Sequence, residues 1–421
     1  MSIYKKIGIA APEIMLPVEG TDLEKWAVIA CDQYTSEPGF WQTADSMVGD
    51  FPSALRLILP EYYLPVETEE QQSKRLADIK NSAEKYLNEG ILKKLPAGFI
   101  LTDRSTSLHP SRKGIMLAID LEAYSFRPED KALVRATEGT VLERIPPRVK
   151  IRSNSPVELP HVMLLIDDPQ GSVIEKAWEM AELQNIPAVY DTDLMQDCGH
   201  IKGVFVQEGS SVADSIVNAL ESLLDNNGDG LLFLVGDGNH SLASAKAYWE
   251  SVKETISDDE KEDHPARFAL VEVVNIHDKG LDFEPIHRVV LGVSQSQLLE
   301  TVNAKYGDAL SSEENAQSFI VIGGEGSSDI RVSFKNPPHP LAVGTCDSVL
   351  KELGYTNVDY IHGEDSLRSL SGANCGIMLP PISKDTFFET VARDGIFPRK
   401  TFSMGEAFEK RFYLEARVIR K

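Results

Sequence analysis

Residues 231–246 read Leu-Leu-Phe-Leu-Val-Gly-Asp-Gly-Asn-His-Ser-Leu-Ala-Ser-Ala-Lys. The unbroken apolar run Leu231–Val235 predicts a buried strand. Residues 236–239 predict a tight turn, because Gly and Asn tolerate the positive φ that such turns need. His240 follows the turn, and residues 241–249 predict a helix that packs closely through its alanines.

This strand, turn and helix together predict an anion-binding site. Backbone N–H groups and the positive end of the helix dipole converge where a helix begins. We expect His240 and Asp237 to be the catalytic groups, since an imidazole exchanges protons near neutral pH and a carboxylate accepts a proton or binds a metal. The residues expected to contact the ligand here are Gly236, Gly238, Asn239 and Ser241.

Cationic side chains elsewhere in the chain are further candidates. The pairs His287-Arg288 and Arg399-Lys400 suit an anion, and we expect all four residues to bind the ligand. A solvated strand end or a surface loop is the alternative for each pair. Three arginines interleaved with prolines, and two polar residues after a predicted strand, are weaker candidates: Arg144, Arg148 and Arg152, and Asp32 and Tyr34.

The composition restricts the class of protein. With 421 residues, the chain is long enough for two or three domains. A net charge of −23 repels nucleic acid and anionic membranes, so a small anionic ligand is the expected partner. None of the four cysteines forms a CxxC pair, which fits a reduced, cytoplasmic setting. The apolar stretch after Lys6 is broken by Pro12 and Pro17, which excludes a signal peptide or a membrane span there.

The order of predicted elements indicates the fold class. Helices, such as the amphipathic segment Glu69–Asn88, mix with strands without strict βαβ alternation. We therefore predict an α+β fold with mixed sheets, peripheral helices and two or three closely packed domains. The expected regions are an N-terminal one (1–160), a central one with the turn (161–290) and a C-terminal one (291–421).

Residues 225–230, Asp-Asn-Asn-Gly-Asp-Gly, match the first half of an EF-hand calcium loop. The twelfth position of such a loop needs a glutamate, and here it is Gly236. The sequence therefore favours a polar turn at this position, and it defines no metal-ligand set.

Three segments carry a family resemblance: Gly-Asp-Gly-Asn-His-Ser from Gly236, Phe-Glu-Pro-Ile-His-Arg ending at Arg288, and Gly-Ile-Phe-Pro-Arg-Lys-Thr ending at Thr401. With them the chain resembles, over nearly its whole length, the prokaryotic family known as domain of unknown function 1015. Its members commonly read Asp-Gly-His-His-Arg, Pro-Thr-His-Arg and Met-Pro-X-Lys-Ser/Thr at these segments.

The Asp-Gly-X-His loop also looks like the loop of the ParB and sulfiredoxin superfamily. There the equivalent turn and helix start hold nucleotide phosphates, and some members are kinases of small hydroxyl substrates. The resemblance thus implies a nucleotide site at this turn. In this chain Ser241 stands where Arg usually follows the His, which removes a phosphate-binding cation. Arg288, Arg399 or Lys400 would replace that cation if they fold nearby.

Two functions remain open. The first is an enzyme of phosphoryl transfer or hydrolysis that uses a nucleotide or phosphorylated metabolite, with magnesium as the expected cofactor. In it His240 or Asp237 is the general base or a metal ligand, and Arg288 with Lys400 stabilises developing negative charge. The second is a sensor that binds an anionic metabolite or nucleotide without turnover.

Overall fold

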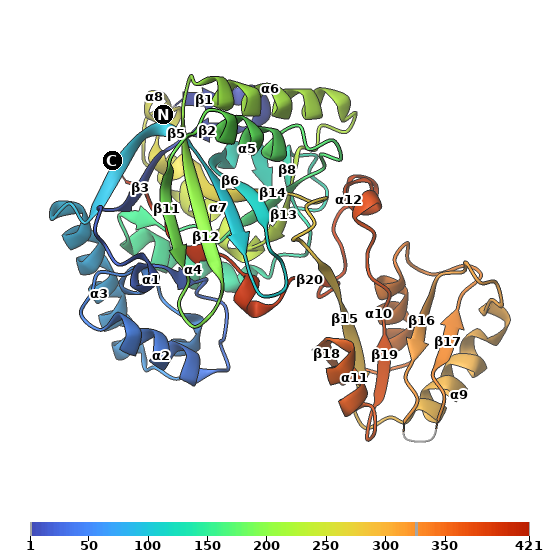
Figure 1. Ribbon diagram of the computed structural model, residues 1–421. Helices are drawn as coiled ribbons and strands as arrows, with labels where there is room; N and C mark the ends of the chain where they lie inside the picture. Colours follow the sequence, from blue (N-terminus) through green and yellow to red (C-terminus); the bar gives the residue numbers. More distant parts are fainter. Residues whose placement is uncertain (1, 325–326, 421) are drawn as a thin grey trace. The chain divides into compact units, whose positions relative to one another are not determined.

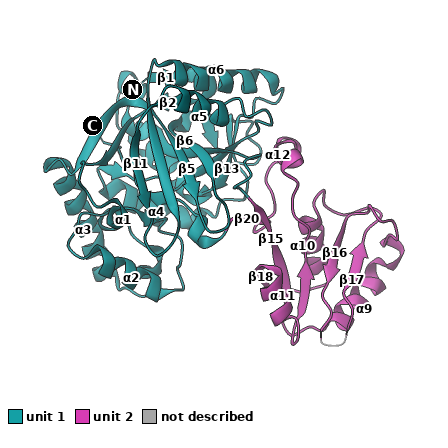
Figure 2. Cartoon of the chain, viewed as in Figure 1, with its two compact units in different colours: residues 1–281, 406–421 teal, residues 282–405 magenta. Residues whose placement is uncertain are grey.

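In the computed structural model, which describes residues 2–324 and 327–420, the strand predicted over Leu231–Val235 is β13 (Phe233–Asp237) and the helix predicted over residues 241–249 is α7 (Asn239–Lys253). The turn predicted over residues 236–239 is shorter than expected, because Gly236 and Asp237 belong to the strand and Asn239 begins the helix. The chain divides into two compact units (Figure 2). Unit 1 comprises residues 1–281 and 406–421, and unit 2 comprises residues 282–405. The chain thus leaves unit 1, forms unit 2 and returns to unit 1.

Unit 1 is built on a mixed sheet that contains twelve strands of the described residues. Besides β13 these strands are β1 (Ser2–Tyr4), β2 (Ile9–Ala11), β3 (Glu13–Pro17), β5 (Leu92–Ser105), β6 (Arg112–Asp120), β7 (Tyr124–Ser125), β8 (Val134–Ala136), β10 (Met163–Ile166), β11 (Ala188–Asp193), β12 (His200–Gln207) and β14 (Phe268–Asn275). Their order is β11-β12-β5-β6-β14-β10-β13-β8-β7, with β2 also on β6, β1 on β2 and β3 on β5. The pairs β10–β14, β13–β8 and β7–β8 are parallel, whereas β5–β6 and β10–β13 are antiparallel.

The helices and short strands of unit 1 surround this sheet (Figure 1). The helices are α1 (Leu23–Trp26), α2 (Pro38–Val48), α3 (Glu69–Asn88), α4 (Ile145–Asn154), α5 (Ile174–Leu183), α6 (Ser211–Asn226) and α8 (Asp258–Lys261). Two short antiparallel pairs join β4 (Val28–Ile29) to β21 (Phe412–Tyr413) and β9 (Val157–Glu158) to β22 (Arg417–Val418). Both pairs link the segment 406–421 to the first part of the chain.

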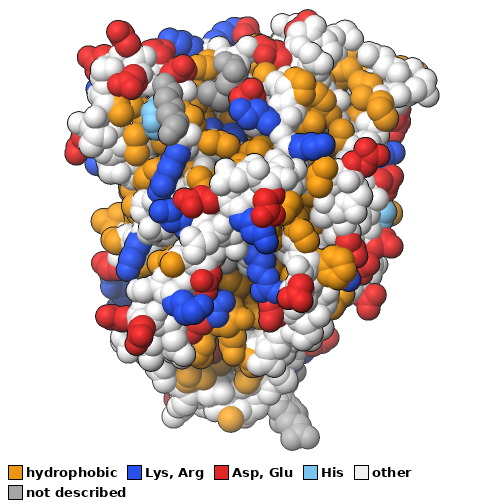
Figure 3. Space-filling model, turned by 90° about the vertical axis from the view of Figure 1, so that its left-hand side faces the viewer, with side chains coloured by type: hydrophobic (Ala, Val, Ile, Leu, Met, Phe, Trp, Pro, Cys, Tyr) orange, Lys and Arg blue, Asp and Glu red, His pale blue; other side chains and the backbone are white. Residues whose placement is uncertain are grey.

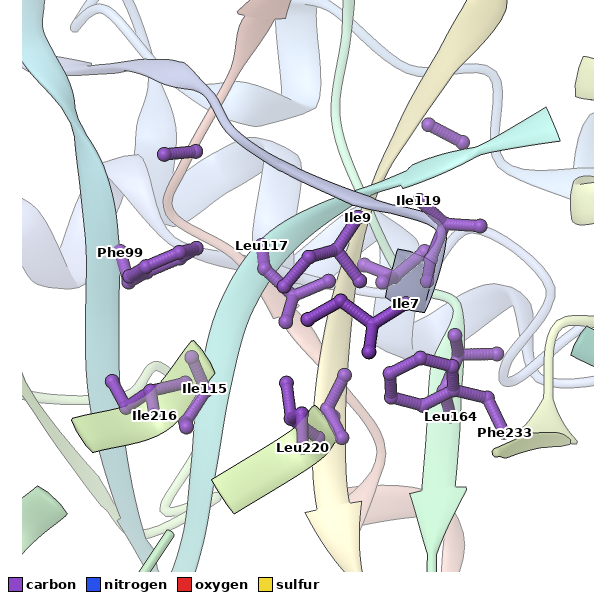
Figure 4. Close-up of a cluster of buried hydrophobic side chains, with 14 of the residues drawn as sticks. Ile7, Ile9, Phe99, Ile115, Leu117, Ile119, Leu164, Ile216, Leu220 and Phe233 are labelled. Carbon is purple, nitrogen blue, oxygen red and sulfur yellow. The ribbon is translucent and has the colours of Figure 1, made fainter. Parts of the chain in front are cut away.

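Side chains of the central strands alternate between two buried faces of the sheet, as the period of a strand requires. On one face, side chains of β5 and β6 pack against helix α6 (Figure 4). The strands contribute Phe99, Ile115 and Leu117, and the helix contributes Ile216 and Leu220. Helix α5 contributes to the same cluster. Because the strands are covered on this side by helices, their apolar residues form a continuous core.

The opposite face is covered by the N-terminal elements and by the returning segment. Ile100, Met116 and Leu270, each next in sequence to a residue of the first face, belong to a second core cluster. Trp26 at the end of α1 and Phe412 of β21 pack in the same cluster. Residues nearly 400 positions apart therefore close the same side of the sheet.

Charged side chains lie inside this second face. The Nη1 atom of Arg411 is 3.4 Å from Oε1 of Glu272, and its Nη2 atom contacts the carboxylate of Glu415. Thr102 donates to Glu272 over 2.7 Å, and Tyr190 donates to Glu415 over 2.5 Å. Burial raises the pKa of Glu272, but the charges of Arg411, Arg112 and Arg104 and the hydrogen bond from Thr102 together outweigh burial, and the net pKa lies below the ordinary value. A buried carboxylate stays ionised here because its countercharge is buried with it.

Local signals explain the helix boundaries. Thr68 accepts a hydrogen bond from the Gln71 N–H, and the Gln71 side chain accepts from the Thr68 N–H, so a capping box starts α3 at the predicted residue. The strand that the sequence predicts before Asp32, over Trp26–Cys31, is wrong in its first part. Asp22 accepts from the Lys25 N–H and caps the short helix α1, and only Val28–Ile29 is extended.

Unit 2 has its own sheet and core. Its strands are β15 (Phe283–Val290), β16 (Ser318–Val321), β17 (Ile330–Ser333), β18 (Val358–His362), β19 (Cys375–Met378) and β20 (Phe402–Met404). The order is β17-β16-β19-β15-β18, with β20 also on β15, and every pairing is antiparallel among the described residues. Its helices are α9 (Gln295–Tyr306), α10 (Ala342–Glu352), α11 (Glu364–Leu370) and α12 (Phe387–Asp394).

The sequence predicts a hairpin from strands over Phe319–Ile322 and Asp329–Phe334, and the antiparallel pair of β16 and β17 confirms it. Residues 325 and 326, inside its predicted turn, lie outside the described residues. The predicted α+β class with mixed sheets and peripheral helices is also confirmed. Residues of the expected regions 1–160 and 161–290 share the twelve-stranded sheet, because β14 pairs with β6 and β10 alike. Within residues 2–324 and 327–420, every helix is too short or too polar to traverse a bilayer.

We expect the substitution Arg411→Met to lower the free energy of unfolding of unit 1 by about 3–5 kcal/mol, because it removes the ion-pair partner of the buried Glu415 and one of the cations beside the buried Glu272. Urea unfolding followed by tryptophan fluorescence measures this, since all four tryptophans belong to unit 1. Lys74→Met is the control: Lys74 pairs with Asp78 on the surface, so its loss costs about 1 kcal/mol or less. Equal effects of the two substitutions would contradict a structural role for the buried network.

Candidate functional site

The turn between β13 and α7 is held in a conformation that favours glycine. Gly238 has φ +79° and ψ 27°, in the left-handed region, and it is the N-cap residue of α7. A Cβ atom added here would lie 3.0 Å from the Cα atom of Val162. The Leu242 N–H donates to the Gly238 carbonyl over 3.0 Å and starts the helix. The turn is therefore tight because strand β10 passes directly beside it.

The N-terminus of α7 is favourable for an anion. None of the described side chains caps it, and its first turn contains no acidic residue. The first N–H groups of a helix lack partners within the helix, and the dipole is positive at this end. An anion there is stabilised by about 0.3–1 kcal/mol from the dipole at an exposed position, and by up to about 2 kcal/mol where partly buried.

Asp237, the last residue of β13, carries a charge at this turn. Its Oδ1 atom accepts from the Gly238 N–H over 2.8 Å, and its Oδ2 atom lies 3.1 Å from Nζ of Lys410. Burial raises the pKa of Asp237, but the charge and hydrogen bond of Lys410, helped by His161, lower the pKa below its ordinary value. The carboxylate is therefore ionised at neutral pH.

His240 is oriented by the backbone of another segment. The Val141 N–H donates to Nε2 of His240 over 3.1 Å. Because Nε2 accepts this hydrogen bond, the neutral ring carries its proton on Nδ1. In this arrangement the ring proton of His240 is on Nδ1, and Nε2 accepts from the backbone.

A chain of polar groups begins at Ser241. Its Oγ atom lies 2.8 Å from Nε2 of His161, and Nδ1 of His161 lies 2.6 Å from the hydroxyl of Tyr413. The Cys31 N–H donates to the same hydroxyl over 3.2 Å. The Oδ2 atom of Asp32 is 3.9 Å from Nε2 of His161. With a proton on Nδ1, His161 donates to Tyr413 and its Nε2 accepts the proton of the Ser241 hydroxyl.

A cavity of about 160 Å³ borders these polar groups. His161, Ser241 and Tyr413 line it, together with Arg148 and Arg152 from α4. The other walls are mostly apolar. Two of the three weaker arginine candidates therefore reach the surroundings of the turn, whereas Arg144 is exposed.

The candidate residues of unit 2 form a separate arrangement. Arg288 is fully buried, with a two-pronged pair to Asp347 at 2.8 and 3.0 Å, and it donates to the carbonyl groups of Lys400 and Arg399 over 3.0 and 3.4 Å. Nδ1 of His287 accepts from a backbone N–H, and burial lowers the pKa of this imidazole. The structure thus brings the segments around Arg288 and Lys400 together within unit 2. The Arg288 guanidinium is saturated by protein groups there, while the side chains of Arg399 and Lys400 are exposed. The ligand-binding role of these four residues stays a prediction.

Other sequence features have local structural roles. Asp229, in the EF-hand-like turn, pairs with Arg135 over 2.7 Å. Tyr34 stacks on Phe40, with ring centroids 3.9 Å apart. In the part of the chain that the structure describes, His, Cys, Asp and Glu nowhere gather in threes suited to a metal ion. Acidic and basic side chains are interspersed on the face drawn in Figure 3.

Three residues of this site were missed by sequence reasoning. The apolar run Val162–Ile166 predicts a strand, and the position of His161 directly before it was an available signal. Lys410 and Tyr413 gave no signal in the sequence, because they follow unit 2 and reach the turn only where the chain returns to unit 1.

Comparison with known proteins identifies the family. The sequence pattern of the family described as "Protein of unknown function (DUF1015)" matches residues 15–354. The chain belongs to this family. No curated protein matches it by sequence.

Solved structures give distant matches to this DUF1015 protein. They include SbnI with a C-terminal truncation from Staphylococcus aureus, at 10% identity and a TM-score of 0.36, covering 69% of this chain and 82% of that one. A free serine kinase in complex with AMP matches at 12% identity and a TM-score of 0.36, covering 70% and 90%. A conserved hypothetical protein from Pyrococcus furiosus matches at 12% identity and a TM-score of 0.33, covering 70% of this chain and 93% of that one. At such scores the matches carry no functional argument.

Outside the turn, two carboxylates hold the ring of His200, the first residue of β12. Its Nε2 atom lies 2.6 Å from Asp191, and its Nδ1 atom lies 2.8 Å from Asp193. Burial lowers the pKa of His200, but the two hydrogen bonds and charges raise it above the ordinary value of about 6.5. Because folding raises the pKa of His200, its interactions with Asp191 and Asp193 stabilise the folded state. This stabilisation is complete below about pH 6.5, and it is lost as the pH rises through the pKa of the folded state.

We expect an NMR titration of the His200 ring to give a pKa above about 6.5, and Asp193→Asn to lower it. Asp214→Asn, at an exposed position of α6, is the control and leaves the His200 pKa unchanged. A wild-type pKa at or below 6.5 would show that the two carboxylates do not hold the ring in solution.

Proposed function

We propose that this protein is a nucleotide-dependent enzyme of phosphoryl transfer or hydrolysis, and that it holds a phosphate group at the Gly236–Ser241 turn. The observation that carries the proposal is the uncapped N-terminus of α7 beside the ion pair of Asp237 and Lys410. Backbone N–H groups, a helix dipole and one lysine are a set of donors suited to a phosphate.

Lys410 supplies the cation at the turn. Ser241 takes the place of the arginine usual in the family, and Lys410 approaches Asp237, four residues earlier, from the returning segment. As phosphate binds, Lys410 is shared between the carboxylate and the phosphate oxygens. A positioned cation of this kind stabilises negative charge that develops in phosphoryl transfer.

Asp237 is better suited to binding a metal than to accepting a proton. Its lowered pKa makes the carboxylate a weak base, whereas an ionised carboxylate oxygen is a ligand that Mg²⁺ prefers. A nucleotide would bring further oxygen ligands with it. Magnesium therefore enters the proposal as part of a metal–nucleotide complex whose protein ligand is Asp237.

His240 and His161 have different chemical parts in the proposal. Nε2 of His240 is occupied by the Val141 N–H, so His240 donates a hydrogen bond from Nδ1 to a phosphate oxygen. We assign the general base to His161: an acceptor hydroxyl or water in the place of the Ser241 hydroxyl, which now lies 2.8 Å from Nε2, would give its proton to Nε2 as its oxygen bonds to the terminal phosphorus and the nucleoside diphosphate leaves. The other nitrogen of the ring is oriented by Tyr413. The base of the reaction is thus assigned to His161, with Asp237 and His240 at the phosphate.

We expect ATP or ADP with Mg²⁺ to raise the melting temperature of the full-length protein. A ligand at about 100 times its dissociation constant adds about 2.7 kcal/mol to the free energy of unfolding. Asp237→Asn is expected to abolish the part of the shift that requires Mg²⁺, and His240→Ala to reduce the shift with and without Mg²⁺. Asp225→Asn, an exposed carboxylate paired with Lys6, is the matched control.

The same samples separate an enzyme from a sensor. Hydrolysis or transfer of the terminal phosphate, followed over hours by ³¹P NMR, supports catalysis, and a bound but unchanged nucleotide supports the sensor. Absence of any shift with nucleotides, with or without Mg²⁺, would refute a nucleotide site at this turn.

A further inference from the structure

The cavity behind Ser241 has a wall chemistry unlike that of the turn. Much of its surface comes from apolar side chains, among them Leu57, Ile151, Leu159 and Leu270. Its volume of about 160 Å³ is close to that of an engineered cavity of about 150 Å³ that accommodates benzene. The apolar walls offer few partners for the sugar and phosphate groups of a nucleotide, so they suit a ligand with an apolar body.

A surplus of positive charge lies in the wall of the cavity. The buried Glu158 carboxylate is shared by two guanidinium groups: Nη2 of Arg152 lies 2.5 Å away, and Nη2 of Arg417 lies 2.6 Å away. One carboxylate balances only one of these two charges. Burial lowers the pKa of Arg417, and the charge of Arg152 adds to this effect while Glu158 opposes it.

Of these two arginines, Arg152 is the one that faces the cavity. Arg417 makes further hydrogen bonds to the carbonyl groups of Pro265 and Phe268. Arg152 lines the cavity, and its side chain keeps an exposed fraction of 15%. Its ion-pair partner among the described residues is Glu158, which it shares with Arg417.

The second arginine of the wall does not offer the same charge. Arg148 contacts the carboxylate of Glu61, and both residues line the cavity, so that pair is neutral. The net attraction for an anion is therefore centred on Arg152.

We propose that this cavity binds a small monocarboxylic acid with an apolar body of about the size of benzene, its carboxylate against Arg152. The planar guanidinium fork matches a carboxylate, and the ligand's charge would balance the second arginine of the cluster. The apolar body replaces water against the leucine and isoleucine walls. This site is distinct from the phosphate site, although Ser241 belongs to the surroundings of both.

The first test is a calorimetric titration of the full-length protein with benzoate and isovalerate, compared with their uncharged amides. It is done without nucleotide and without Mg²⁺, so that its outcome does not depend on the phosphate site. We expect each acid to bind at least tenfold more tightly than its amide. Equal affinities, or no binding of either acid, would overturn the proposal without needing any variant.

Arg152→Met locates the charge that selects the acid. Glu158 keeps Arg417 and the Leu270 N–H as partners in this variant, so the fold retains its buried pair. The acid should lose at least tenfold in affinity, while the amide changes little. Arg144→Met, on the exposed turn before α4, is the matched control. Where Arg152→Met unfolds, Arg152→Lys keeps the charge without the planar fork and should bind the acid more weakly than wild type. Undiminished preference for the acid in a folded Arg152 variant would overturn the proposal.

Discussion

The buried guanidinium of Arg411, between the carboxylates of Glu272 and Glu415, is the interaction on which the rest of unit 1 depends. It joins strand β14 of the sheet to a segment that returns after the whole of unit 2. Removing these charges from water is costly, and only their mutual pairing offsets the cost. The pairing fixes the segment that carries Lys410 and Tyr413, so one buried ionic contact positions two groups of the candidate site.

The surroundings of the turn divide into two regions of opposite character. At the turn, N–H groups, Lys410 and an ionised Asp237 create a polar region that favours phosphate oxygens. Behind Ser241, apolar walls and the charge of Arg152 favour a carboxylate with an apolar body. Ser241 and His161 lie where the two regions meet, and the Ser241 Oγ atom is 2.8 Å from Nε2 of His161.

Local sequence signals predicted the elements well where the signal was itself local. The period of α3 and its capping box lie within the same residues, and the Gly238 turn needs only its own left-handed backbone. Contacts over long separations were not predictable in this way. His161 meets Tyr413 252 positions later, and Arg288 is neutralised by Asp347 59 positions later, so a cationic motif in the sequence became a buried ion pair in the fold. One sequence carries no information on which partner such a charge will meet.

The interruption of unit 1 by residues 282–405 has a consequence for the newly made chain. Translation proceeds from the N-terminus, so all of unit 2 leaves the ribosome before residues 406–421 do. Until then one face of the large sheet lacks Phe412 from its core, and Glu272 lacks one of the cations beside it. A ribosome that stalls within unit 2 therefore holds a nascent chain with exposed apolar surface, which is the kind of surface that chaperones recognise.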